Sequence, residues 1–251
     1  MADEKMKKSR SIFISCHPGL GDNLICNGLF REFALKYENV IIPTYNYYVP
    51  TIKEMFGDVP GIKVLPVGNI YHARFRQLLR GLSKTGIYDI LRLGGSNSNW
   101  SGDERGSTRF DEMFYRQAGL DFSTRWTSFV SPKPVESGQK IMQDLGLSPG
   151  EYIFLHEDVS RDFKVNRRYL NRDYPIFTPD LVKGTVSFFD YYWLIRNAAE
   201  IHCIESSFSA FIESVDTGWG IKKFAHRYAR SDVNIDVHLE ATYRTEWSIL
   251  R

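Results

Sequence analysis

The feature that most constrains the fold is a repeated order of short apolar strand, polar loop and amphipathic helix. Runs rich in β-forming residues occur at 11–16, 62–67, 152–156 and 222–226, and segments with helical spacing of apolar residues lie between them. Strands that alternate with helices are typical of parallel sheets, because a crossover must return the chain before the next strand can pair. The sequence therefore predicts an α/β fold.

A stretch with prolines and small polar residues, SPKPVESG at 131–138, divides this series in two. We expect residues 1–132 and 133–251 to form two Rossmann-like half-domains with parallel sheets that face a cleft. Ligands of open α/β sheets bind beyond the carboxyl ends of the strands. The loops that directly follow strands are therefore expected to carry the function.

The net charge, the cysteines and the distribution of apolar residues bear on the partners and the cellular location of the protein. The formal net charge is +2 and the sequence pI is about 8.3, which by itself indicates no particular partner. Three cysteines occur without a CxxC spacing, which favours buried thiols in a reducing compartment. The N-terminal residues lack the apolar core of a signal peptide, and the sequence has no apolar run of about 18 residues. We therefore expect a cytoplasmic protein without a membrane span.

The loop after the first strand, HPGLGDN at 17–23, is the first candidate binding loop. Gly19 and Gly21 let the backbone approach a ligand closely, and the start of the following helix favours an anionic group. Asp22 is expected at or near the N-cap of that helix, either as a functional carboxylate or only as a cap. The glycine spacing differs from GxGxxG, so it does not predict a dinucleotide site.

The segment HPGLGDNLICNGLFREFA resembles the beginning of heptosyltransferase-like glycosyltransferases of the GT-B type, in which a strand leads into a Gly-x-Gly-Asp loop. In that family the aspartate after the second glycine acts as general base on the acceptor hydroxyl. The resemblance implies this role for Asp22. Gly19 and Gly21 are the candidates for donor contact in this loop, and His17 could face the cleft and contact the acceptor.

Polar residues also follow a strand of the second half, in YIFLHEDVSRDF. His156 ends that strand, so its ring could face the cleft. Arg161 follows closely, and a guanidinium there suits a pyrophosphate because its fork donates to two oxygens at once. The other interpretation of Arg161 is a surface ion pair with a neighbouring acid.

The stretch IHCIESSF at 201–208 places three polar residues between a strand and a helix. Ser206 and Ser207 open the helix, and hydroxyls beside free backbone N–H groups at a helix start form an anion site. Glu205 is expected to accept hydrogen bonds from ribose hydroxyls. A serine that only caps the helix is the alternative, and it is compatible with anion binding.

The stretches RFDEMFYRQAGLDFSTRW and IHCIESSF resemble a group of small bacterial and viral proteins placed near the heptosyltransferases. In the C-terminal half of GT-B enzymes, a strand, a Ser/Thr turn and a helix hold the diphosphate of the donor. The resemblance implies that 133–251 bind a nucleoside-diphosphate sugar, that 1–132 face the acceptor, and that transfer needs no metal ion or other cofactor. The implied donor-binding residues of the second half are His156, Arg161, Glu205, Ser206 and Ser207.

Basic residues gather in two places. Arg74, Arg76, Arg80 and Lys84 form one cluster, and 161–172 contains the other. Such runs are usually solvated faces, but they would also suit a polyanionic acceptor such as a phosphorylated glycan or nucleic acid. Arg74 and Arg76 are the candidates for acceptor contact.

Three functions remain open from the sequence. The first is a glycosyltransferase that moves a sugar from a nucleoside-diphosphate donor to a hydroxyl of a glycan or another acceptor. The second is a nucleotide- or glycan-binding module of the same fold without turnover. The third is a viral-type glycosyltransferase that acts on modified bases in DNA. The histidines have no partners at metal-ligand spacing, so we expect no zinc site.

Overall fold

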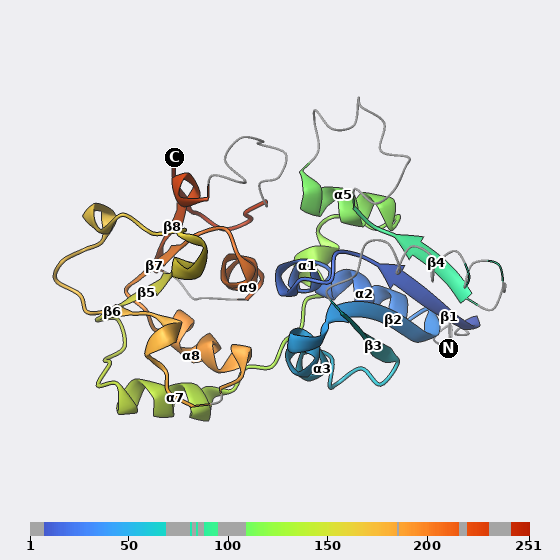
Figure 1. The fold of residues 1–251 in the computed structure, drawn as a ribbon, viewed down its shortest axis with the longest axis horizontal. Coiled ribbons are helices and arrows are strands. Elements are labelled where there is room, and N and C mark those ends of the chain that lie inside the picture. Colours follow the sequence, from blue (N-terminus) through green and yellow to red (C-terminus); the bar gives the residue numbers. More distant parts are fainter. Residues whose placement is uncertain are drawn as a thin grey trace, which may run out of the picture. The chain divides into compact units, whose positions relative to one another are not determined.

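The computed structural model describes residues 8–68, 81, 84, 88–94, 109–184, 186–215, 220–230 and 242–251. The chain divides into two compact units, Met1–Ser131 and Pro132–Arg251. Each unit contains a parallel sheet with helices packed on it (Figure 1). The predicted α/β class, with a parallel sheet in each half, is confirmed.

The sheet of the N-terminal unit has the strand order β3-β2-β1-β4, and each neighbouring pair is parallel. Its central strand is the first predicted apolar run, in which Ile12, Phe13 and Ile14 are almost fully buried. A strand covered on both faces reads as a continuous apolar run, which is why the sequence locates it. The strands are β1 (Lys8–Ser15), β2 (Tyr37–Tyr45), β3 (Ile62–Val67) and β4 (Tyr88–Arg92).

Apolar spacing after β1 predicts one helix that continues to residue 36, but the structure has two, α1 (Leu20–Ile25) and α2 (Asn27–Ala34). The Tyr115 hydroxyl donates to the carbonyl oxygen of Ile25 over 2.7 Å. The side chain of Asn27 bonds both the N–H and the carbonyl of Val130. These partners lie far along the chain, so local periodicity cannot reveal the break. The unit also contains α3 (Val49–Met55), α5 (Phe110–Gln117) and α6 (Thr124–Thr127).

The sheet of the C-terminal unit has the order β6-β5-β7-β8-β9 and is also parallel throughout. The strands are β5 (Ile153–His156), β6 (Ile176–Phe177), β7 (Glu200–Cys203), β8 (Lys222–His226) and β9 (Ser248–Leu250). The helices of this unit are α7 (Val135–Asp144), α8 (Tyr191–Arg196) and α9 (Ser207–Ser214). In both sheets the carboxyl ends of the strands meet at one edge, which we call the carboxyl edge.

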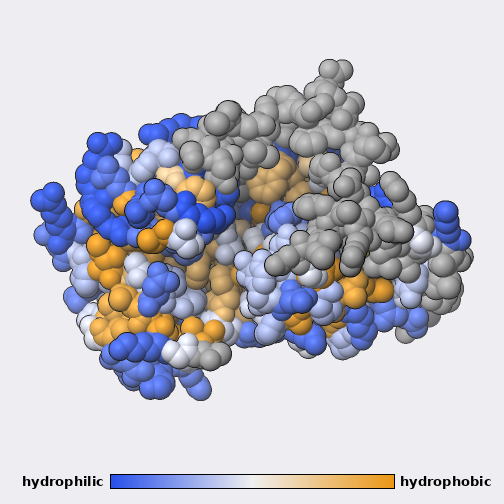
Figure 2. Space-filling view, in the orientation of Figure 1, coloured by the Kyte–Doolittle hydropathy of each residue, from blue (hydrophilic) through white to orange (hydrophobic). Residues whose placement is uncertain are grey.

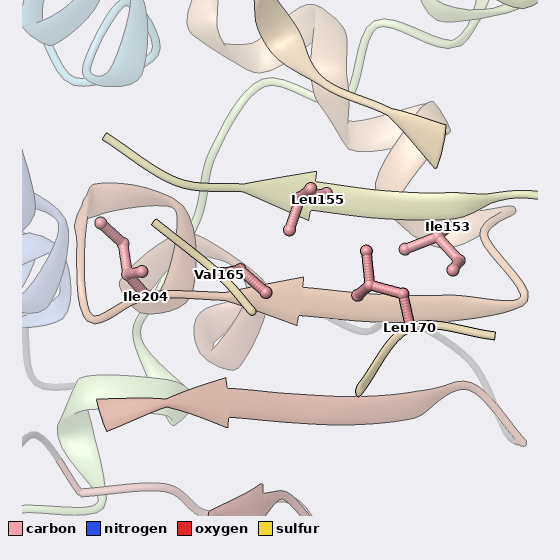
Figure 3. Close-up of a cluster of buried hydrophobic side chains, with 5 residues drawn as sticks. All are labelled: Ile153, Leu155, Val165, Leu170 and Ile204. Carbon is pink, nitrogen blue, oxygen red and sulfur yellow. The ribbon is translucent and has the colours of Figure 1, made fainter. Parts of the chain in front are cut away.

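The loop that follows β5 is part of the core. Val165 and Leu170 of this loop form a buried apolar cluster with Ile153, Leu155 and Ile204. Figure 3 shows these side chains converging above the two neighbouring strands β5 and β7. Because the loop is anchored by buried side chains, it returns to the sheet and fixes the surroundings of the carboxyl edge.

The C-terminal segment is held by one buried carboxylate. Glu213 of α9 is unexposed and accepts hydrogen bonds from the backbone N–H groups of Arg244 and Thr245 and from the indole of Trp247. This segment leads into β9, which the sequence does not predict. Local periodicity could not predict β9, because the contacts of Glu213 that hold this segment join residues about thirty positions apart.

The surface mixes polar and apolar side chains. On the face shown in Figure 2, apolar areas lie between charged ones, as on most globular proteins. The exposed large apolar side chains include Leu35 at 65% and Tyr47 at 63%. Among the residues that the structure describes, no helix has the length and apolar character needed to cross a membrane.

One ion pair of the N-terminal unit lies entirely inside the protein. Asp111 in the first turn of α5 is paired with Arg125 of α6, and neither side chain is exposed. The guanidinium also lies 5.3 Å from the centroid of the Trp126 ring. Moving charges out of water is costly, so each partner of a buried pair depends on the other.

Arg125→Met should destabilise the protein by about 3–5 kcal/mol, because Asp111 would keep a buried charge without a counter-ion. The double variant with Asp111→Leu should recover most of that loss, since it removes both charges from the interior. The free energy of unfolding, from urea denaturation, measures both effects. Lys140→Met is the control, because its pair with Asp144 is exposed, and it should change stability by less than about 1 kcal/mol. A double variant no more stable than Arg125→Met would contradict this interpretation.

Candidate functional site

The carboxyl edge of the N-terminal sheet carries the first predicted loop. Gly19 is the N-cap of α1 and Asp22 lies in the first turn as the third residue of that helix, so Asp22 stands near the cap but is not the capping residue. The carboxylate of Asp22 instead bonds the ring of His17, with 3.1 Å between Oδ2 and Nδ1. The sequence places both residues in one loop but does not predict that they pair.

This loop is held to the neighbouring strand and to its own helix. The carbonyl oxygen of Pro18 accepts from the hydroxyl of Thr44 over 3.1 Å and from the N–H of Tyr45 over 3.2 Å, both at the end of β2. The Asn23 side chain donates to the carbonyl of Gly19 over 2.8 Å. A Cβ at Gly19 would lie only 3.1 Å from His17 Nδ1. A larger residue at this position would therefore require the His17 ring to shift by a few tenths of an ångström.

The pair His17–Asp22 is electrostatically coupled and reaches the surface. The hydrogen bond from Asp22, assisted by its charge, raises the pKa of His17 although burial opposes the effect. The His17 side chain is half exposed, at 51%. Its ring meets the edge of Tyr45 with 6.0 Å between centroids, and Tyr45 stacks on Tyr47 at 5.5 Å. This edge therefore combines a carboxylate, an imidazole and aromatic rings open to solvent.

The carboxyl edge of the C-terminal sheet joins two predicted residues. His156 is the last residue of β5, and Ser206 is the N-cap of α9, directly beyond β7. The Ser206 hydroxyl lies 3.1 Å from His156 Nδ1 and also accepts from the N–H of Ser209 in a capping box. Burial lowers the pKa of His156 to about 4, so the ring is neutral at pH 7. Ser207 is the first residue of α9 and is partly exposed.

Two arginines border one aromatic ring near this edge. Arg161 lies in a turn closed by backbone bonds between Asp158 and Phe163, and its guanidinium is 5.0 Å from the Phe163 centroid. Arg161 also pairs with Asp158 over 2.7 Å, which is the surface ion pair that the sequence left open. Arg230 approaches the same ring at 5.6 Å and donates to the carbonyl oxygen of Glu205 over 2.6 Å. The sequence analysis missed Arg230, although its place shortly after a predicted strand was an available signal.

The carboxylate of Glu205 is more buried than its place after a strand suggests. The residue is only 9% exposed. Burial raises the pKa of the Tyr243 hydroxyl, the charge of Glu205 adds to this effect, and Arg227 opposes it. The charges of Glu205 and Arg227 therefore both act on Tyr243, which lies in the C-terminal segment before β9.

No protein family model and no curated protein matches the chain. Among solved structures, a family 9 glycosyltransferase from Veillonella parvula aligns with a TM-score of 0.52 and 9% identity, over 88% of this chain and 81% of that one. The iron-containing dodecameric glycosyltransferase TibC from enterotoxigenic E. coli aligns with a TM-score of 0.51 and 12% identity, over 96% of this chain and 62% of TibC. The chain has a GT-B glycosyltransferase fold. The resemblance drawn from the sequence is therefore confirmed for the fold.

A third similar structure is ADP-heptose LPS heptosyltransferase II of E. coli, with a TM-score of 0.47 and 10% identity, over 86% of this chain and 84% of that one. Identities this low transfer no residue roles. The site of this GT-B protein must therefore be argued from its own side chains.

The second basic cluster of this GT-B protein contains its own counter-charges. Arg161 pairs with Asp158, Lys164 with Asp162 over 2.6 Å, and Arg167 with Glu157 over 2.6 Å. Such pairing reduces the attraction of the cluster for a polyanion. Arg74 and Arg76, the predicted acceptor contacts, lie outside the described residues, as does Arg80 of the same cluster.

Metal-ligating residues do not converge in the part of the chain that the structure describes. Within those ranges, no group of three or more His, Cys, Asp or Glu side chains is arranged to hold a metal ion. Metal independence itself stays a prediction.

Asp22→Asn should lower the pKa of His17 toward 6.5, the value from which Asp22 raises it. The pKa is measured by following the His17 ring through a pH titration by NMR. Because the folded-state pKa is raised, the contribution of the pair to stability is complete below the unfolded pKa and disappears as pH rises through the folded one. Asp58→Asn is the control, since Asp58 pairs with Arg31 instead, and it should leave His17 unchanged. An unshifted His17 in Asp22→Asn would show that the pair does not exist in solution.

Proposed function

We propose that the protein is a glycosyltransferase that moves a sugar from a nucleoside-diphosphate donor to a hydroxyl acceptor. The observation that carries this proposal is the start of α9, where Ser206 and Ser207 stand at the carboxyl edge beside His156. Backbone N–H groups and hydroxyls at a helix start favour a diphosphate. The GT-B fold, shared with known glycosyltransferases, supports the same activity.

The donor is proposed to bind at the C-terminal unit through its diphosphate. Ser207 and the first N–H groups of α9 would donate to its oxygens, and Arg161 and Arg230 would supply positive charge nearby. His156 holds the Ser206 hydroxyl while remaining neutral, so it orders the helix start. When the sugar leaves the diphosphate, the growing negative charge would be stabilised by these donors. In this proposal the reaction uses neither a metal ion nor another cofactor.

The acceptor is proposed to react at the loop of the N-terminal unit. Asp22 would take the proton of the acceptor hydroxyl as its oxygen attacks the anomeric carbon, and the diphosphate would leave with the electrons of the broken bond. His17 would orient the Asp22 carboxylate through the observed hydrogen bond. Gly19 and Gly21 leave room for backbone approach to the donor. Glu205, being buried, would act on the ribose only through a small displacement of its side chain.

Experiments distinguish the proposed glycosyltransferase from a binding module and from an enzyme that acts on DNA. A binding module without turnover would bind a nucleoside diphosphate but transfer no sugar. An enzyme acting on DNA would bind duplex with an affinity that falls steeply as salt rises, and a salt-independent or absent interaction would count against that acceptor. The cytoplasmic location stays a prediction from the sequence.

Ser207→Asp should lower the affinity for nucleoside diphosphates by about tenfold or more, because like charges repel at close range. It should leave the helix as stable or raise stability by about 0.3–1 kcal/mol, since an acidic residue favours a helix start. Calorimetric titration with ADP, UDP, GDP and CDP measures the affinity, and thermal unfolding measures the stability. Ser207→Asn is the neutral control and should keep most of the affinity. If none of the four nucleotides binds the wild-type protein, the proposed function is wrong.

Asp22→Asn should keep nucleotide affinity and lower sugar transfer by about 10²-fold or more, the usual scale for the loss of a general base. Transfer is followed as nucleoside diphosphate released from the donor in the presence of acceptor. Asp58→Asn serves as the matched control in the same unit, because Asp58 is engaged by Arg31. Full activity in Asp22→Asn would remove Asp22 from the proposed mechanism.

A further inference from the structure

A chain of hydrogen-bonded groups runs through the C-terminal sheet from the start of β7 to a loop beyond β5. Glu200 Oε2 lies 3.4 Å from His202 Nε2, and His202 Nδ1 lies 2.9 Å from His226 Nε2. His226 Nδ1 lies 3.0 Å from the Tyr228 hydroxyl, which accepts from the N–H of Asn166 over 2.7 Å. Both histidines are fully buried. Neither was used in the proposed reaction.

The Glu200 end of the chain sets the direction of the hydrogen bonds between neutral rings. The Glu200 carboxylate can only accept, so His202 carries its proton on Nε2 and donates to Glu200. Neutral His202 then accepts at Nδ1 from Nε2 of His226, and neutral His226 accepts at Nδ1 from the Tyr228 hydroxyl. That hydroxyl keeps acceptor capacity for the N–H of Asn166. The opposite order would leave the unprotonated Nε2 of His202 facing a carboxylate, with two acceptors in contact.

The interior keeps both rings neutral in this order. Burial lowers the pKa of His202 to about 4 and that of His226 to about 3, and for His226 the neighbouring charges of His202 and Arg167 add to the effect while Glu157 opposes it. Phe224 stacks on His202 at 4.4 Å, and Tyr169 meets His226 edge-on at 5.8 Å. Neither imidazole is exposed to solvent. The proton order should therefore persist through the neutral pH range.

Asn166 belongs to the segment 157–167, which we call the donor loop because it contains Arg161. Within this loop Glu157 accepts from the N–H of Val165 over 2.8 Å and from both terminal nitrogens of Arg167. Burial alone would raise the pKa of Glu157, but these bonds hold it below its usual range. The hydroxyl of Tyr228, in the turn that follows β8, holds the returning half of the loop.

We propose that Tyr228, His226 and His202 form a positioning element whose fixed proton order holds the donor loop in the arrangement that binds the diphosphate. The part of this inference that concerns the donor rests on the proposed function. The part that concerns loop order rests on the hydrogen bonds alone. Tyr228 is a positioning residue, because its hydroxyl contacts the loop backbone and acts on Arg161 through it.

The proton order has a direct spectroscopic test in the unliganded protein. Nitrogen-15 NMR of the imidazole rings at pH 7 should show protons on Nε2 of both His202 and His226, and unprotonated Nδ1 atoms. Tyr228→Phe should then change the Nδ1 signal of His226, because the ring loses the hydroxyl that donates to it. Tyr169→Phe is the matched control, since the Tyr169 hydroxyl bonds the exposed side chain of Arg168. A proton on Nδ1 of either histidine in the wild-type protein would overturn the inference.

The effect on the loop and on the donor is measured with the same two variants. In Tyr228→Phe, hydrogen-exchange protection of the Asn166 amide should fall by about tenfold or more, because the amide loses the hydroxyl that accepts its hydrogen bond. Calorimetry with ADP, UDP, GDP and CDP should show affinity weakened by about tenfold for whichever nucleotide binds. Tyr169→Phe should change neither quantity.

The outcomes separate this inference from the proposed function. Unchanged protection of Asn166 in Tyr228→Phe overturns the positioning element, whatever the nucleotides do. Lost protection with unchanged affinity overturns its connection to the donor. Lost protection in a protein that binds none of the four nucleotides supports the loop-ordering role and contradicts the proposed function.

Discussion

The parallel pairing of β5 with β7 is the constraint on which the C-terminal site depends. Its register sets His156 opposite Cys203, and the N–H of Ile204 donates to the carbonyl oxygen of His156 over 3.1 Å. The chain then turns into α9 within reach of the imidazole, so Ser206 meets His156 although fifty residues separate them. The N-terminal unit is arranged in the same way, since the carbonyl oxygen of Pro18, in the loop after β1, accepts hydrogen bonds from the end of β2. Each site is thus a consequence of strands that end at a common edge.

Much of the fold could be predicted from the sequence because the strands are short, apolar and bounded by polar loops. The strands β3 and β8 have the predicted limits, 62–67 and 222–226. The serine pair at the start of α9 was also predicted, since a strand followed by Ser-Ser and an apolar helical spacing is a local pattern. What the pattern could not give was the partner of Ser206, because register across a sheet is a property of the folded chain.

The features that were missed depend on contacts between distant segments. The break between α1 and α2 requires Tyr115 and Val130, and the segment before β9 depends on Glu213. For Asp22 the sequence left a functional carboxylate and a cap open, and Gly19 takes the cap. The carboxylate of Asp22 bonds His17 instead, a pairing that the helix signals of the sequence do not reveal.

The proposed reaction would place different electrostatic requirements on the two carboxyl edges. A diphosphate site would need positive potential, yet a cationic imidazole at His156 would compete with the ligand for the Ser206 hydroxyl, and burial lowers the pKa of that ring. Positive charge would come instead from Arg161 and Arg230, the first half exposed beside Asp158. An ion pair in water is worth little, so Arg161 would exchange Asp158 for a diphosphate oxygen at small cost. At the other edge the proposed requirement is reversed, because a general base must stay anionic until it receives a proton. There a half-exposed histidine of raised pKa stands beside the carboxylate. Because an exposed pair is held weakly, the proposed role requires only a small cost for Asp22 to release His17 before it accepts a proton.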